Sequence, residues 1–151
     1  MIDVPQAAVD LAKRFEGFHR VPKNDPSRAH PYICPAGYWT IGYGRLCKPD
    51  HPPISQDQAE AVLREDLRTA LAATLKFCPV LASEPEARLA AIVDFTFNLG
   101  AGRLQTSTLR RRINQRDWRS ASQELQRWVY AGGVVLSGLV TRRYEETQLL
   151  K

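Results

Sequence analysis

The sequence has 151 residues, of which 44% are hydrophobic and 25% are charged. This composition is typical of a folded globular domain and excludes disordered and fibrous chains. The formal net charge of +5 at pH 7 predicts attraction to polyanions, namely nucleic acid, anionic membranes or the acidic polymers of a bacterial envelope. Residues 1–11 contain neither a basic segment nor a long apolar stretch, so we expect no signal peptide and no stable membrane insertion.

The N-terminal part is expected to form one helix and one small β element. Asp3 and Pro5 mark a helix start, and the apolar residues that follow at helical spacing place Glu16 near the helix C-terminus. Prolines and small polar residues predict a loop over 19–31. Aromatic and β-branched residues over 32–44, interrupted by a proline-glycine turn, predict an antiparallel β-hairpin, the only β structure that the sequence indicates.

The remainder of the chain is predicted to be helical. Ser55 and Gln58 form a capping box that opens a long helix to about Phe77. Further helices are expected between Ser83 and Gly100 and over about 106–115, 117–130 and 138–150. The fold class is therefore α+β in a single domain, 1–151. A small N-terminal lobe (about 15–55) holds the hairpin, and the long helix joins it to a larger helical lobe (about 1–14 and 56–151).

The cysteines and histidines do not form a metal-binding pattern. The three cysteines are odd in number and lack CxxC spacing, so we expect no metal site, and we expect no cofactor. Two of them could pair as a Cys47–Cys78 disulfide, or all three could be reduced, Cys34 being the third. The histidines lack helical i, i+4 spacing and are expected in loops: His19, His30 and His51.

Several short motifs follow one another in a fixed order along the chain. They are Phe15-Glu16-Gly17, Tyr38-Trp39-Thr40-Ile41-Gly42-Tyr43-Gly44, Phe97-Asn98-Leu99-Gly100, and Gly138-Leu139 followed by Arg142-Arg143. This ordered set covers nearly the whole chain and resembles the phage-type lysozymes, glycoside hydrolase family 24. The resemblance implies a lysozyme-like fold. It also implies hydrolysis of the β-1,4 bond between N-acetylmuramic acid and N-acetylglucosamine in peptidoglycan, which leads to lysis of the host cell.

The resemblance also assigns catalytic positions. Glu16 takes the place of the general acid, and the helix C-terminus together with nearby aromatic rings favours the protonated form that such an acid needs. Thr40 takes the place of a hydroxyl that helps to hold the attacking water. Cys34 stands where the family has a catalytic aspartate. Its thiolate could act as base or nucleophile, Thr40 and backbone groups could position water without it, or Asp25 could supply a carboxylate. We favour participation of Cys34.

Four further residues are expected to bind substrate or to position the acid. Arg142 and Arg143 stand where the resemblance has a basic residue near the acid, although either could instead be a solvated partner of Glu145 or Glu146 on the same helix. Asn98 and Tyr38 are candidates for substrate binding, and capping or packing is the alternative role for Asn98.

Arginines concentrate between Arg103 and Arg127, and this stripe could adhere to anionic envelope polymers or be an ordinary solvated face. We expect a monomer that binds glycan strands and no nucleic acid. Synthesis in the cytoplasm without a signal peptide would require release to the wall in the periplasm through a holin. The alternatives are a lytic transglycosylase on the same substrate, a basic nucleic-acid-binding protein supported only by the stripe, and a wall-binding module that has lost catalysis.

Overall fold

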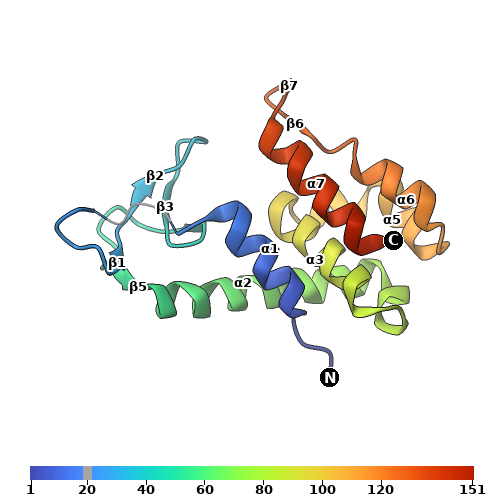
Figure 1. The fold of residues 1–151 in the computed structure, drawn as a ribbon, viewed down its shortest axis with the longest axis horizontal. Coiled ribbons are helices and arrows are strands. Elements are labelled where there is room, and N and C mark those ends of the chain that lie inside the picture. Colours follow the sequence, from blue (N-terminus) through green and yellow to red (C-terminus); the bar gives the residue numbers. More distant parts are fainter. Residues whose placement is uncertain (19–21) are drawn as a thin grey trace. The chain divides into compact units, whose positions relative to one another are not determined.

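The structure is a computed structural model that describes residues 1–18 and 22–151 (Figure 1). The chain divides into two compact units. We call Ala12–Asp66 the N-terminal unit, and Met1–Leu11 together with Leu67–Lys151 the helical unit. Helices α1 (Gln6–Glu16) and α2 (Gln56–Phe77) each contribute residues to both. The predicted α+β class is confirmed, because helices and short antiparallel strands share the chain.

The N-terminal unit holds the predicted hairpin as part of a three-stranded antiparallel sheet, in the order β2 (Tyr32–Ile33), β3 (Trp39–Ile41) and β4 (Arg45–Leu46). A second pairing joins β1 (Arg28–Ala29) to β5 (Ile54–Ser55). The expectation of a single β element is therefore wrong. Strands of two residues cannot display the alternation of polar and apolar side chains by which a strand is recognised in sequence.

The sheet of the N-terminal unit packs on α2 through the turn between β3 and β4. Ile41 and Tyr43 are buried there. A Cβ added to Gly42 would lie only 3.0 Å from the Cβ of Ala59 on α2, so this glycine permits the close approach of turn and helix. Gln56 of α2 donates a hydrogen bond of 3.2 Å from its Nε2 to the Tyr43 hydroxyl. These contacts fix the turn against the first half of α2.

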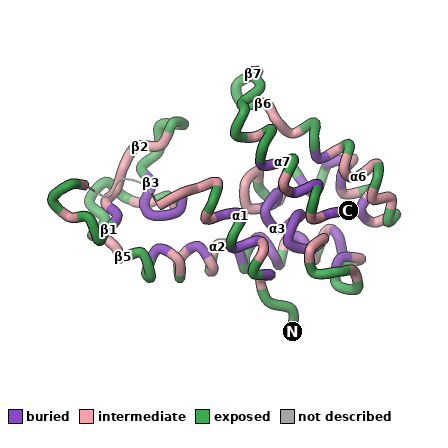
Figure 2. The backbone as a smooth tube through the Cα atoms, viewed as in Figure 1, coloured by how far each residue is buried: buried purple, intermediate pink, exposed green. Residues whose placement is uncertain are grey.

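The helical unit contains most of the predicted helices, and Figure 2 shows α3 as its most continuously buried segment. Its elements are η1 (Pro79–Ser83), α3 (Glu86–Leu99), α4 (Ala101–Gln105), α5 (Thr108–Asn114), α6 (Trp118–Leu125) and α7 (Ser137–Leu150). The short helix α4 was not predicted. Helix α6 ends five residues before the predicted limit at 130, because the chain leaves the helix toward a second hairpin.

That hairpin, β6 (Tyr130–Ala131) and β7 (Val134–Val135), was also not predicted. Its turn is Gly132-Gly133, with φ values of 58° and 78°. Two consecutive positive φ values are typical of the tight turns that match the twist of a hairpin, and glycine adopts them without steric cost. The Gly-Gly pair was therefore a usable signal, which the adjoining helical patterns obscured.

The core of the helical unit forms where α3 packs along α7 and α5 packs along α6. Phe95 of α3 is fully buried and meets the ring of Trp128 edge-on, with 5.6 Å between the ring centroids. The remaining core is aliphatic and includes Ile92, Leu104, Leu109, Ile113, Leu125 and Leu150. Within the described residues no helix is long and apolar enough to cross a membrane.

The capping box predicted for α2 is present, and its removal gives a first testable prediction. The Gln58 amide donates to Ser55 Oγ at 3.1 Å, and the Ser55 amide donates to Gln58 Oε1 at 2.8 Å. Ser55→Ala leaves one helix N–H without its acceptor and should lower the free energy of unfolding by about 1 kcal/mol. Urea denaturation followed by circular dichroism measures this loss. Ser137→Ala, an exposed serine in the first turn of α7, is the control, and equal losses in both variants would contradict the capping role.

Candidate active site

Glu16 is the last residue of α1 and is half-buried. The helix stops there because Gly17 adopts a φ of 70° and donates its amide to the Lys13 carbonyl at 2.9 Å, which is a common way to end a helix. The sequence motif therefore ends the helix directly after the acid. The carboxyl consequently lies at the C-terminal end of the helix, which is the negative end of the helix dipole.

Cys34 and Thr40 lie on the same face of the three-stranded sheet. The register places Tyr32 opposite Thr40 and Ile33 opposite Trp39, and the Cys34 amide donates to the Tyr38 carbonyl at 2.9 Å. Because side chains alternate along a strand, Tyr32, Cys34 and Thr40 share one face, while Ile33 and Trp39 share the other. Thr40 is 2% exposed and donates to the Tyr38 carbonyl at 3.0 Å, whereas Cys34 is half-buried.

The turn that follows Cys34 stabilises a negative charge on its sulfur. The Tyr38 amide gives the largest effect, followed by the Thr40 hydroxyl and the amides of Ala36 and Gly37, and together these hydrogen bonds lower the pKa of the Cys34 thiol below its ordinary value. Partial burial opposes the effect without cancelling it. A group of amides around one sulfur favours a thiolate, which can accept a proton.

Arg142 is buried in the helical unit and pairs with Asp94 of α3. Its Nε donates to Asp94 Oδ2 at 2.9 Å and its Nη2 donates to Asp94 Oδ1 at 2.7 Å, so the guanidinium is held in a two-point ion pair. Arg142 is 4% exposed and Asp94 is 0% exposed. The alternative of a solvated arginine is therefore wrong for this residue.

Arg143 is also buried, and it is held by other partners. Its Nη2 donates to Asn98 Oδ1 at 2.6 Å and to Glu146 Oε2 at 3.1 Å, and its guanidinium lies over the ring of Phe95. The alternative pairing with Glu146 is present, although in the core rather than in solvent. Burial, together with a hydrogen bond to the carboxylate of Asp94, raises the pKa of Glu146 above its ordinary value. Asn98 thus holds an arginine within the unit.

The other candidates of the N-terminal unit are arranged as follows. Tyr38 is 62% exposed at the tip of the hairpin, where its ring is available to a ligand. Asp25 accepts hydrogen bonds of 2.8 Å from the ring of His30 and from Arg28 Nε, and the bond from His30 contributes most to lowering the pKa of Asp25. Its carboxylate is therefore engaged within its own loop. His19 lies outside the described residues.

The cysteines are three free thiols, so the structure contains no Cys47–Cys78 disulfide. Burial raises the pKa of Cys78 to about 12 and also raises the pKa of Cys47. Of the three, only Cys34 has a lowered pKa. No three histidine, cysteine or carboxylate side chains gather into a possible metal site in the part of the chain that the structure describes.

Part of the arginine stripe has structural roles. Arg110 donates to the carbonyls of Phe77 and Gln105, and Arg116 pairs with Glu84 at 2.7 Å. Arg111 borders a polar hollow of about 550 Å³. The exposed arginines of the stripe are Arg103, Arg111, Arg116, Arg119 and Arg127, of which Arg116 and Arg127 each pair with a glutamate.

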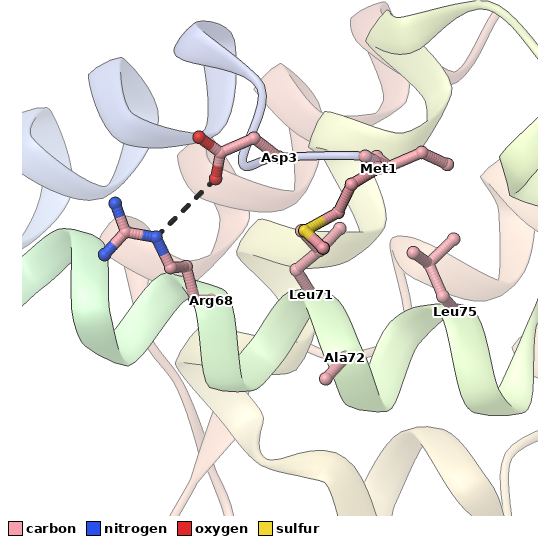
Figure 3. A pocket seen from close by; sticks show the side chains of 7 residues that line it. Met1, Asp3, Arg68, Leu71, Ala72 and Leu75 are labelled. Atoms are coloured by element: carbon pink, nitrogen blue, oxygen red, sulfur yellow. Dashed lines mark ion pairs between the residues drawn. The ribbon is translucent and has the colours of Figure 1, made fainter.

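A second hollow of the helical unit, of about 740 Å³, lies between the first residues and α2 (Figure 3). Its lining is mainly apolar: Met1, Ile2, Asp3, Arg68, Leu71, Ala72 and Leu75. Asp3 Oδ1 lies 3.6 Å from Arg68 Nε, so the two charged groups form an ion pair across it. None of the predicted site residues lines this hollow, and we assign it no part in the chemistry.

Asp94 is not among the predicted site residues, although the sequence contains a signal for it. It follows Ala90-Ala91-Ile92-Val93 and precedes Phe95, so it is a lone charge within a run of apolar residues. A carboxylate in the middle of a buried helix needs a partner, because an unpaired buried charge is strongly unfavourable. The sequence therefore predicts that Asp94 has a partner. It does not identify that partner as Arg142, which lies 48 residues away on α7.

The different environments of the three thiols predict different reactivities. Only the thiolate reacts with iodoacetamide, so Cys34 should be alkylated at lower pH than Cys47, while buried Cys78 should stay unmodified in the folded protein. Thr40→Val removes a hydroxyl within hydrogen-bond reach of both the sulfur and the Tyr38 carbonyl, and should move the alkylation midpoint of Cys34 to higher pH. Mass spectrometry of peptides after timed labelling measures each site. Equal midpoints for Cys34 and Cys47 would contradict the stabilised thiolate.

Comparison with known proteins places the chain in a family. The family model described as phage lysozyme matches residues 13–146. The SAR-endolysin of Bacteriophage PS34 is 39% identical over 124 residues, which are 81% of this chain and 73% of that protein. The endolysin of Bacillus phage B103 is 33% identical over 150 residues, which are 98% of this chain but 54% of that protein, so the chain spans about half its length.

Two solved structures have a fold similar to that of this chain. The active form of the P1 phage endolysin Lyz superimposes with a TM-score of 0.82 at 25% identity, covering 99% of this chain and 85% of that one. The muramidase domain of SpmX from Asticaccaulis excentricus gives a TM-score of 0.81 at 27% identity, covering 99% and 98%. The lysozyme-like fold expected from the sequence is confirmed. On the family match over residues 13–146 and these relatives, the chain belongs to the phage lysozyme family.

Proposed function

We propose that this chain is a muramidase of the endolysin type, which hydrolyses the β-1,4 bond between N-acetylmuramic acid and N-acetylglucosamine in peptidoglycan. The observation that carries the proposal is the hydrogen-bonded Cys34 thiol, which lies with Thr40 on one face of the sheet. Its amide-lined turn supplies a proton acceptor at the position where the family resemblance has an aspartate. The family match, which contains every candidate residue from Glu16 to Arg143, supports the same assignment.

In the proposed reaction, Glu16 gives its proton to the glycosidic oxygen as the bond between this oxygen and the anomeric carbon breaks. A water molecule attacks the anomeric carbon, and its proton passes to the Cys34 thiolate. The turn amides hold the sulfur in place, and the Thr40 hydroxyl oxygen accepts a hydrogen bond from the water. Exchange with solvent then returns the proton to Glu16 and removes the proton from Cys34. A base at this position gives inversion, whereas a thiolate nucleophile would give retention.

The roles of the other residues follow from their surroundings. Arg142 and Arg143 both remain candidates for positioning the acid on the family resemblance, and both are held in the core, the first by Asp94 and the second by Asn98 and Glu146. Asn98 accordingly acts through Arg143 rather than on the sugar. Tyr38 offers an exposed ring to the glycan. Asp25 is a poor candidate for the base, because His30 and Arg28 already hold its carboxylate.

The setting of this activity is also a proposal. Relatives named SAR-endolysin are consistent with action in the periplasm, and release of a cytoplasmic protein through a holin would bring the enzyme to the wall. The exposed arginines Arg103, Arg111 and Arg119 could add adhesion to anionic envelope polymers. We propose that the enzyme acts as a monomer. Neither a transglycosylase nor a nucleic-acid-binding function is favoured by any of the named relatives.

Replacement of the acid tests the function directly. Glu16→Gln keeps the shape of the side chain but removes the acidic proton. The rate of hydrolysis of purified peptidoglycan should therefore fall by about 10²- to 10⁴-fold. Glu60→Gln is the matched control, because Glu60 is a half-buried carboxylate of the same unit that pairs with Lys13 at 3.1 Å. Mass spectrometry of the released muropeptides should show reducing ends. Anhydromuramic ends would establish a transglycosylase, and full activity of Glu16→Gln would refute the assignment of the acid.

The pH dependence tests Cys34. A base works when deprotonated, so activity should rise as the pH passes upward through the Cys34 pKa, which lies below the ordinary thiol value. Cys34→Asp supplies a carboxylate with an ordinary pKa of about 3.9 and should extend activity to lower pH. Cys34→Ala should lose activity at every pH. Rates of turbidity loss, measured in buffers from acidic to mildly alkaline pH, distinguish these profiles. A Cys34→Ala profile equal to that of the unmodified enzyme would show that the thiol takes no part in catalysis.

A further inference from the structure

Gly44 makes a close contact with the acid within the N-terminal unit. It lies in the turn between β3 and β4 with a φ of 89°. A Cβ built on its main chain would lie 3.1 Å from Glu16 Oε2 and 3.6 Å from Glu16 Cδ. Side-chain carbons rarely come so near to a neighbouring atom, so even a methyl group here would require the Glu16 carboxyl to move by a few tenths of an ångström. The main chain at Gly44 therefore limits where the Glu16 carboxyl can lie.

The turn that bears Gly44 is itself held on both sides. Gly42 touches α2 through Ala59 and also meets Ile54, at 3.0 Å and 3.4 Å from a built Cβ. Arg45 pairs with Ile41 across the strands, and its Nε lies 3.8 Å from Asp66 Oδ1. Because Gly42 and Arg45 are held by these contacts, the main chain at Gly44 cannot easily move away from Glu16. The Glu16 side chain, by contrast, can rotate about several single bonds, so it is the side chain that would give way.

We propose that Gly44 is a positioning residue for the acid, and that glycine is required there for space as well as for conformation. The inference rests on the proposed function, because it concerns the carboxyl assigned as general acid. A catalytic group must be held to within about 0.5 Å of its productive position. The main chain of Gly44, which has no side chain, lies beside the carboxyl and restricts it to that position.

Gly44→Ala tests the proposal against a matched control. Both Gly44 and Gly133 have positive φ values, 89° and 78°, but a Cβ at Gly133 would meet nothing within 4 Å. Both alanine variants should melt at lower temperature, because both strain the backbone. Only Gly44→Ala should lower kcat on purified peptidoglycan, on the order of tenfold per folded molecule, with KM unchanged, since the glycan-binding surface is not altered. Gly44→Ala with the kcat of the unmodified enzyme would overturn the proposal.

A spectroscopic measurement shows whether the acid itself has moved. With ¹³C-labelled glutamate, the carboxyl signal of Glu16 is assigned by its disappearance in Glu16→Gln. This signal should shift in Gly44→Ala and stay in place in Gly133→Ala. A fall in kcat without a shift of the signal would mean that the added methyl group acts elsewhere, and a shift without a fall in kcat would mean that the position is not critical. Either result overturns the proposal.

Glu16→Gln and Gly44→Ala distinguish an error in the proposed function from an error in the role of Gly44. If Glu16→Gln retains activity, the proposed function is wrong whatever Gly44→Ala does. If Glu16→Gln is inactive while Gly44→Ala keeps both the kcat and the Glu16 signal of the unmodified enzyme, the proposed function is supported and the proposed role of Gly44 is wrong. The proposal is supported only when Gly44→Ala alone changes kcat and signal together, with Gly133→Ala like the unmodified enzyme in both.

Discussion

The register of β2 against β3 decides which side chains the N-terminal unit can bring together. With Tyr32 opposite Thr40, the sulfur of Cys34 and the hydroxyl of Thr40 share one face. A slip by one residue would exchange this face with that of Ile33 and Trp39 and separate the two groups. The hydrogen bonds across the turn, from the amides of Cys34 and Gly37, fix the register. The same few residues that close the turn also surround the sulfur, so local structure and chemistry cannot vary independently.

The helical unit shows a comparable dependence on buried charge. Asp94, Arg142, Arg143 and Glu146 are nearly inaccessible to solvent, and removing four ionisable groups from water is costly unless each is well paired. Apolar side chains of similar size often give equal or greater stability at such positions. The presence of charged groups in this core is therefore poorly explained by stability alone. What the pairing does provide is a fixed geometry, since both oxygens of Asp94 hold the Arg142 guanidinium in one orientation.

Much of this arrangement was predictable from the sequence, for reasons that differ between residues. The capping box at Ser55 and the helix end at Gly17 depend on neighbours in the chain, which a sequence displays directly. The roles expected for Glu16 and Cys34 came from resemblance to a family, and no local pattern would have supplied them. The pairing of Asp94 with Arg142 joins residues far apart in sequence, and β1 and β5 are too short to show a periodicity. Such features depend on tertiary packing.

The contact between Gly44 and Glu16 has a consequence for how this sequence can be varied. A glycine in a turn is usually regarded as replaceable by another residue that tolerates a positive φ, such as asparagine. At position 44, asparagine could adopt the positive φ, but its Cβ would still lie too close to the Glu16 carboxyl. Positions 16 and 44 therefore behave as one coupled pair. A library that randomises the hairpin while holding the acid constant would be restricted at position 44 by a residue on a different element, and the hairpin alone would not reveal the reason.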